Sequence, residues 1–155
     1  MIIRQTGKVP WSLQPDRNGD FEEIARRAAA RGLPPVRYPE GWPVQTYSII
    51  ALRAALFVSD QRERRALSRA MFRTAFVDGR HLADLDTVLQ AAAGAGLDAE
   101  AVRAGMERQE IKDALRAETE AAVSRGVTGV PTVAVGEDLF WGDDRLEDAA
   151  TALAG

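Results

Sequence analysis

The sequence has 155 residues, 46% of them hydrophobic, and its 20 basic and 23 acidic residues leave a formal net charge of −3. This composition is typical of one globular domain, and the interleaved charges offer no basic surface to nucleic acid or to an anionic membrane. Zero cysteines and a single histidine, His81, exclude disulfides, thiolate catalysis and a metal site made from the cysteines or histidines of one chain.

The N-terminus, MIIRQTGKVP, contains too short an apolar stretch for a signal peptide. No later segment approaches the about 18 consecutive apolar residues of a membrane span, so a soluble cytoplasmic protein is expected. Turn-forming residues recur from Gly7 to Gly19. They predict a loop over residues 1–19, after at most a short strand at residues 2–3.

A first helix is predicted over residues 20–31. Asp20 is its candidate N-cap, and Gly32 stands where a left-handed residue ends a helix. Its apolar positions recur at helical spacing: Phe21, Ile24, Ala25 and Ala28. The next stretch, LPPVRYPEGWPV, contains four prolines, which fix φ and remove backbone donors. We expect an extended connection there, with the rim of a pocket as a second role.

Between Thr46 and Gly126 the apolar residues keep a period near 3.6, which predicts a block of four or five helices. Asp60 with Glu63 is a candidate capping box, and two further aspartates, Asp84 and Asp98, are candidate caps. Three apolar stripes are interpreted as core. They consist of Leu67, Ala70, Met71 and Thr74, of Leu85, Val88 and Leu89, and of Ile111, Leu115, Ala122 and Val123.

After Gly126 the pattern changes from helix to strand. Residues 132–135, a turn at 136–138 and residues 139–141 together predict a β-hairpin. Asp143 or Asp144 then caps a terminal helix, and Glu147 completes a capping box with Asp144. The apolar residues of this helix predict that it packs on the hairpin: Leu146, Ala149, Ala150 and Leu153.

A hairpin and a helix preceded by Gly-Val-Pro-Thr are similar to the C-terminal half of a thioredoxin fold. The stretch GVTGVPTVAVGEDLFWGDDRLEDAA resembles the DsbA-like branch of that fold, in particular 2-hydroxychromene-2-carboxylate isomerases and kappa-class glutathione transferases. The resemblance extends upstream through LRAETEAAVSRG, GLDAEAV, ALRAAL, WPVQT and RGLP. It implies one helix-rich α/β domain over residues 1–155, with an all-helical insertion at 20–126 and the ββα half of a thioredoxin-like fold at 127–155.

The family's first strand and helix, with an Asp-Phe-x-Ser-Pro-Tyr-like motif, have no counterpart here, so we expect the N-terminal βαβ segment to be largely missing. Thr6-Gly7-Lys8 stands where the family has Thr-Gly-Asn, which places Lys8 at a substrate-binding position. Without the first strands, the hairpin exposes an apolar face and unpaired backbone groups. We expect a homodimer to cover this surface, because the family is commonly dimeric. A separate chain or a folded-back N-terminus is the alternative.

The resemblance implies that glutathione pairs, as an added strand, with the backbone of Val130 beside a cis bond to Pro131. From the dipeptide alone, a trans bond that merely shapes the strand entry is favoured, because about 5–6% of X–Pro bonds are cis. The resemblance also implies that Asp143 and Asp144, at a helix start with free N–H groups, bind the γ-glutamyl end. The alternative for Asp144 is helix capping alone.

Other side chains are candidates for binding an aromatic substrate. Lys8 and Arg145 carry the charge that a substrate carboxylate requires. Trp11, Trp42 and Trp141 are able to form flat apolar walls. Each has a structural alternative, since a tryptophan beside a proline more often packs in the interior and Arg145 more often lies on the helix surface.

Two functions follow from the resemblance. The first is a glutathione-dependent isomerase or transferase of aromatic catabolism, in which a thiolate adds reversibly to the substrate and permits bond rotation. No catalytic residue is assigned, and low activity is expected because the family's activating serine has no counterpart. The second is a non-catalytic binding or subunit protein, or a truncated homologue. The absence of cysteine excludes a disulfide oxidoreductase, which the fold branch also suggests.

Overall fold

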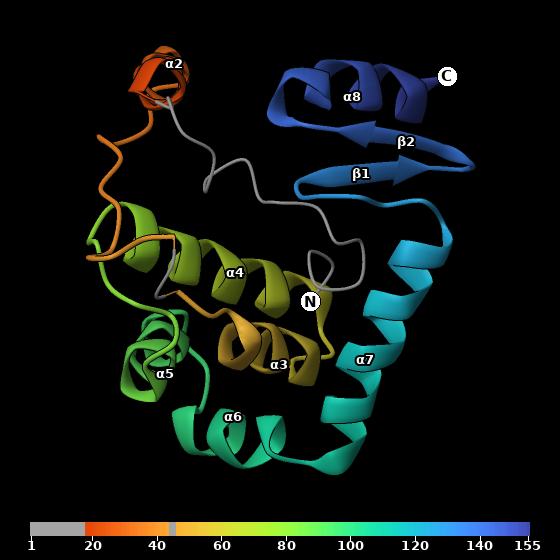
Figure 1. Cartoon of the computed structure of the whole chain (residues 1–155). Coiled ribbons are helices and arrows are strands. Elements are labelled where there is room, and N and C mark those ends of the chain that lie inside the picture. Colours follow the sequence, from red (N-terminus) through yellow and green to blue (C-terminus); the bar gives the residue numbers. More distant parts are fainter. Residues whose placement is uncertain (1–17, 44–45) are drawn as a thin grey trace. The chain divides into compact units, whose positions relative to one another are not determined.

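Figure 1 shows a computed structural model of the chain, which describes residues 18–43 and 46–155. The described residues form two compact units, one within residues 18–115 and the other over residues 116–155. The boundary falls inside helix α7 (Gln109–Ser124). The expected single domain over the whole chain stays a prediction. The predicted strand at residues 2–3 lies outside the described residues.

The larger unit is helical. Its helices are α2 (Asn18–Ala30), α3 (Ile49–Phe57), α4 (Gln61–Phe76), α5 (Leu85–Gly94), α6 (Ala99–Met106) and the first turns of α7. The predicted block of four or five helices between residues 46 and 126 is confirmed as α3 to α7. No helix in the described ranges is both long and apolar enough to cross a membrane.

The start of α2 differs from the prediction. The helix spans Asn18–Ala30 rather than residues 20–31, so Asp20 lies in its first turn instead of capping it. The helix ends at Ala30, one residue before the predicted end, and the predicted stop at Gly32 is confirmed, because Gly32 has a φ of 66°.

Three aspartates start helices as their positions predict. The Asp60 carboxylate accepts a hydrogen bond from the Glu63 N–H. Asp84 and Asp98 each accept hydrogen bonds from two N–H groups of the following turn. Each cap satisfies donors that the helix leaves open and typically contributes about 1 kcal/mol.

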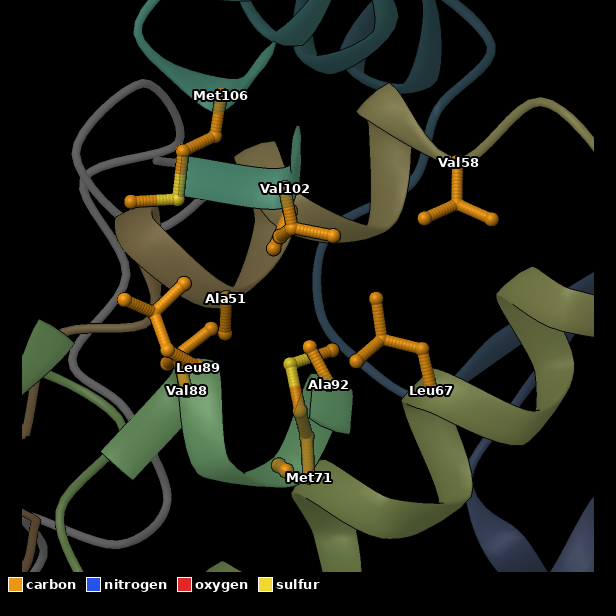
Figure 2. Packing of buried hydrophobic residues seen from close by; sticks show 11 residues of the cluster. Ala51, Val58, Leu67, Met71, Val88, Leu89, Ala92, Val102 and Met106 are labelled. Atoms are coloured by element: carbon orange, nitrogen blue, oxygen red, sulfur yellow. The ribbon is translucent and has the colours of Figure 1, made fainter. Parts of the chain in front are cut away.

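The core of the larger unit lies between α3, α4, α5 and α6, and Figure 2 shows side chains from all four helices directed into one interior. Leu67 and Val88 are fully buried, and each such side chain contributes about 1.5–3 kcal/mol. The predicted stripes supply Leu67, Met71, Val88 and Leu89 to this core, with Ala70 and Leu85 packed at its edge.

Helices α3 and α6 approach each other closely at Gly105. Gly105 is buried, and a Cβ atom on it would overlap the ring of Phe57 in α3. The guanidinium carbon of Arg108 lies 5.4 Å from the centroid of the same ring. The ring thus contacts both a glycine backbone and a cation, and a larger residue at position 105 has no room.

A polar network fixes the connection between α4 and α5. The Thr87 hydroxyl is buried, donates to the Asp84 carboxylate at 2.6 Å and accepts from the Arg80 guanidinium at 3.0 Å. The hydrogen bond from Thr87, together with backbone N–H donors and the charge of Arg80, lowers the pKa of Asp84 below its ordinary value of 3.8.

The smaller unit contains the predicted hairpin. Strand β1 (Thr132–Val135) pairs antiparallel with β2 (Asp138–Trp141). The turn consists of Gly136 and Glu137, with Gly136 at a φ of 57°. Asp138 therefore belongs to the strand and not to the turn that the sequence predicts at 136–138, because a two-residue turn suffices when its first residue is left-handed.

A 3₁₀ turn, η2 (Asp143–Arg145), joins the hairpin to the terminal helix α8 (Leu146–Ala154). Helix α8 packs on β1 and β2, as its apolar face predicts, and its Ala149 is buried. The fold class is confirmed as a helix-rich chain that ends in a β-hairpin and a helix.

We expect Gly105→Ala to lower the free energy of unfolding by about 1–3 kcal/mol, because the Phe57 ring has to leave a well-packed position. Gly94→Ala is the matched control, since a Cβ at Gly94 in α5 meets nothing within 4 Å. That variant should be neutral, or more stable by up to about 1 kcal/mol. Urea denaturation measures both changes, and equal midpoints would contradict the close contact.

We expect Thr87→Val to lower the free energy of unfolding by about 1 kcal/mol at neutral pH, through the lost hydrogen bonds of the buried hydroxyl. The pKa of Asp84 should rise towards its ordinary value. A lowered carboxylate pKa contributes stability above that value, and the contribution is lost as the pH falls through the folded-state pKa. The difference from the native sequence should therefore narrow below about pH 3.8.

Denaturation curves across this pH range measure the effect. Ser68→Ala is the control, since the Ser68 hydroxyl donates to the Arg64 carbonyl of its own helix and should show no such pH dependence. A stability difference for Thr87→Val that stays constant down to about pH 3 would argue against the coupling with Asp84.

Candidate functional site

The segment before β1 forms the first part of the candidate site. The peptide bond between Val130 and Pro131 is cis, so this expectation from the resemblance is confirmed. Val130 is 74% exposed, and no hydrogen bond to its N–H or C=O group occurs within the described part of the chain. Exposed backbone donors and acceptors at the entry to a strand are able to pair with an extended ligand.

The turn after β2 brings the two candidate aspartates beside this segment. The Gly142 N–H donates to the Pro131 carbonyl at 3.0 Å, and Asp143 and Asp144 follow directly. Gly142 has a φ of 108°, and a Cβ atom there would overlap the Asp144 carboxylate. This hydrogen bond thus joins the two segments that contain the four residues predicted to bind glutathione: Val130, Pro131, Asp143 and Asp144.

The predicted capping box of Asp144 and Glu147 is wrong. Asp144 lies within the 3₁₀ turn, and Arg145 occupies the N-cap position of α8 without a side-chain cap bond. The turn displaces the helix start by one residue, which moves Asp144 away from the capping position. Helix capping, the alternative to ligand binding for Asp144, is therefore not observed.

Arg145 is engaged within its own helix turn. Its Nε donates to the Asp148 carboxylate at 2.5 Å, and its guanidinium carbon lies 5.5 Å from the Phe140 ring centroid. The surface role that was the alternative for Arg145 agrees with these contacts. Binding of a substrate carboxylate by Arg145 stays a prediction. Lys8 and Trp11, the other substrate-binding candidates of the N-terminal segment, lie outside the described residues.

Trp42 belongs to an aromatic cluster of the larger unit. Its ring centroid lies 4.6 Å from that of Tyr38 and 6.0 Å from that of Phe21. Tyr38 also contacts Phe76 of α4, and burial raises the pKa of the Tyr38 hydroxyl. Such aromatic pairs stabilise the proline-rich connection, which agrees with the packing alternative for Trp42. A substrate contact of Trp42 stays a prediction.

A cavity of about 350 Å³ lies between α7 and β1 in the smaller unit. Its charged lining residues are Glu118 and Arg125, and the Arg125 guanidinium donates to the Gly136 carbonyl at 2.6 Å. The remaining lining residues are small or apolar: Ala121, Ala122, Val127, Val130, Thr132 and Ala134. Its size falls in the range of small-molecule sites, and it shares Val130 with the exposed strand entry.

Trp141 adjoins this site. It is 60% exposed and lies opposite Thr132, so both side chains stand on the same face of the hairpin. Its indole nitrogen is 2.8 Å from the position of a Cβ atom on Gly129. Sequence reasoning ranked Trp11 and Trp42 with Trp141 as equals. The sequence could have distinguished Trp141 from the other two, because Trp141 ends a predicted strand whose partner strand begins just after Val130 and Pro131.

The described residues contain no group of three or more histidine, aspartate or glutamate side chains arranged to hold a metal ion.

Comparison with known proteins identifies relatives of the fold. The model of the DSBA-like thioredoxin domain matches residues 7–154. A structure of 2-hydroxychromene-2-carboxylate isomerase superposes with a TM-score of 0.80 at 19% identity, covering 99% of this chain and 74% of that one. A probable DsbA oxidoreductase from Streptomyces coelicolor superposes with a TM-score of 0.73 at 27% identity. A search of curated proteins found no match.

The second superposition covers 99% of this chain and 64% of the oxidoreductase, so the chain spans about two thirds of that neighbour's length. The likeness to the isomerase, at 19% identity, concerns the fold. Both superpositions extend over the helical part as well as the hairpin, because each covers nearly all of this chain.

We expect Gly142→Ala to lower the free energy of unfolding by about 1–3 kcal/mol, because an alanine would be strained at this φ and would displace Asp144. Gly136→Ala is the control, since Gly136 also has a positive φ but a Cβ there meets nothing within 4 Å. It should cost less. Thermal unfolding of both variants measures the difference, and equal losses would show that Asp144 yields without strain.

Proposed function

We propose that this chain, which belongs to the DSBA-like thioredoxin domain family, binds glutathione as an added strand along the backbone of Val130. The observation that carries the proposal is Val130, which is exposed and whose N–H and C=O groups make no hydrogen bond within the described part of the chain. Unpaired strand-entry groups of this kind bind extended peptides through main-chain hydrogen bonds, and neighbouring side chains then select the peptide.

Cysteine is the residue of glutathione that suits Val130. In an antiparallel pair, two opposed residues exchange an N–H···O=C bond in each direction. Cysteine, the middle residue of the tripeptide, carries both an amide N–H and an amide carbonyl. Pairing at Val130 would leave the thiol and the two ends of the ligand free to reach side-chain contacts.

The turn at Gly142 supplies partners for the γ-glutamyl end in this proposal. The Gly142 bond to Pro131 keeps Asp144 next to the paired segment, and α8 begins two residues later. The ligand's ammonium group would pair with Asp144, and its carboxylate would approach the N-terminal end of α8, where the helix dipole favours negative charge. Asp143 contributes a second carboxylate to the same turn.

Isomerisation of a chromene carboxylate is the second candidate function. It is favoured by the superposition on 2-hydroxychromene-2-carboxylate isomerase and by the cavity that shares Val130. The thiolate of bound glutathione would form a C–S bond to the double bond of the substrate, and the resulting single bond would rotate. Cleavage of the C–S bond would then restore the double bond and the thiolate, so nothing is oxidised or reduced.

Disulfide chemistry, which the name of the second neighbour describes, is not proposed for this chain, because its 155 residues contain no cysteine. The homodimer and the cytoplasmic location stay predictions.

Calorimetric titration with glutathione tests the proposal. We expect binding, and an analogue methylated on the cysteine nitrogen should bind at least about 10-fold more weakly, because the Val130 carbonyl loses its donor. The matched control is an analogue methylated on the glycine nitrogen, which keeps both cysteine groups. Failure of glutathione to bind, or equal affinities of the two methylated analogues, would refute pairing at Val130.

An assay of chromene carboxylate isomerisation, with and without glutathione, separates the two functions. Binding with thiol-dependent turnover supports the isomerase, and binding without turnover supports a non-catalytic glutathione-binding protein.

A further inference from the structure

We infer that the outward side of α4 is a docking surface for an acidic segment of another protein, one that carries an apolar side chain among its carboxylates. The surface consists of four arginines and one phenylalanine of α4, and we call it the arginine face: Arg62, Arg65, Arg69, Arg73 and Phe72. It lies in the larger unit, and the inference does not depend on glutathione binding.

The sequence of α4 gathers these arginines on one side of the helix. The remaining arginine of the helix, Arg64, is half-buried and donates to the Val58 carbonyl at 2.7 Å. The other four recur at intervals of three or four residues, which places them on one side of an α-helix. Figure 2 shows Leu67 and Met71 of the same helix directed into the core. The arginine face is turned away from that core, and its four arginines are exposed.

The four arginines are unpaired in the part of the chain that the structure describes, since the side chain of none of them makes a hydrogen bond or an ion pair there. On other helices, exposed arginines are paired with carboxylates, as Arg26 is with Glu23 and Arg103 with Glu100. Like charges three or four residues apart on a helix repel each other, and the one acidic residue of α4 is Glu63. A row of carboxylates on a partner would remove this repulsion.

Phe72 adds an apolar contact at the edge of the arginine face. Its side chain is 63% exposed, and its ring stacks on that of Phe76, with 6.3 Å between the centroids and an interplanar angle of 20°. Phe76 in turn lies edge-on to Tyr38. The aromatic cluster thus supports the Phe72 ring and leaves most of it open to an apolar side chain of a partner.

Charge and size favour an acidic protein segment over a nucleic acid or a membrane. Arg62 and Arg73 lie about 16 Å apart along the helix axis, a length that a short peptide segment covers. A guanidinium group binds a carboxylate through two parallel hydrogen bonds. Nucleic acids and anionic membranes extend phosphate groups well beyond such a face, and there the net charge of −3 of the whole chain opposes them.

Fluorescence anisotropy with the full chain tests the inference. The probe is a labelled peptide of Glu-Glu-Phe repeats, and we expect it to bind with an affinity that falls as salt is added. Arg65→Ala combined with Arg69→Ala should weaken binding about 5- to 10-fold, because two ion pairs are lost. The control combines Arg26→Ala with Arg103→Ala. It removes the same charge from α2 and α6 and should change the affinity by less than about 2-fold.

Phe72→Ala separates the apolar contact from the charges. It should weaken binding of the Glu-Glu-Phe peptide about 3- to 10-fold, because an apolar contact is lost. A peptide of Glu-Glu-Ser repeats should bind the variant and the native sequence equally well. Equal losses for the two peptides would overturn the apolar contact at Phe72.

Failure of the Glu-Glu-Phe peptide to bind, or equal losses in the two double variants, would overturn the docking surface. Tighter binding of a single-stranded oligothymidylate of equal charge would overturn the assignment to an acidic protein segment. Sedimentation of the chain alone tests a second copy as the occupant. We expect Arg65→Ala with Arg69→Ala to leave the oligomeric state unchanged, and a dimer that dissociates in this variant would overturn the inference of a separate partner.

Discussion

The hydrogen bond from the Gly142 N–H to the Pro131 carbonyl is the constraint on which the candidate site depends. It ties the turn after β2, which contains Asp144, to the segment before β1, which contains Val130. Because the Pro131 carbonyl is occupied by this bond, the peptide unit of Val130 is what the segment offers to a ligand. Gly142 makes the bond possible, since its φ of 108° is one that other residues rarely adopt.

The helical unit could be predicted from its sequence because its signals are local. Asp84 and Asp98 cap the helices that they precede, and Leu67 and Val88 are buried where a period of 3.6 places them. The network through Thr87 was not predicted, because it depends on Arg80, which lies in a connection between helices whose path the sequence does not specify. Local sequence patterns predict where helices begin and which residues are buried. They do not predict the hydrogen bonds that a long side chain makes in the folded chain.

The features of the candidate site also divide into those that could be predicted from the sequence and those that could not. The resemblance identified the cis bond before Pro131, which the dipeptide alone would have assigned as trans. The capping role of Asp144 was wrong because a 3₁₀ turn precedes α8, and such a turn has no clear sequence pattern. The contrast between Trp42 and Trp141 needed the structure, since a tryptophan's exposure depends on neighbours such as Gly129 and Tyr38.

Pairing of the Val130 backbone with glutathione is tested most directly by the behaviour of the Val130 amide proton. Nuclear magnetic resonance of the protein during titration with glutathione follows the Val130 N–H signal and its exchange with solvent. Pairing predicts that this proton shifts and becomes protected from exchange, whereas the N–H of the exposed Gly96, which belongs to the larger unit, stays unchanged. Binding of glutathione with no change at the Val130 amide would contradict the account.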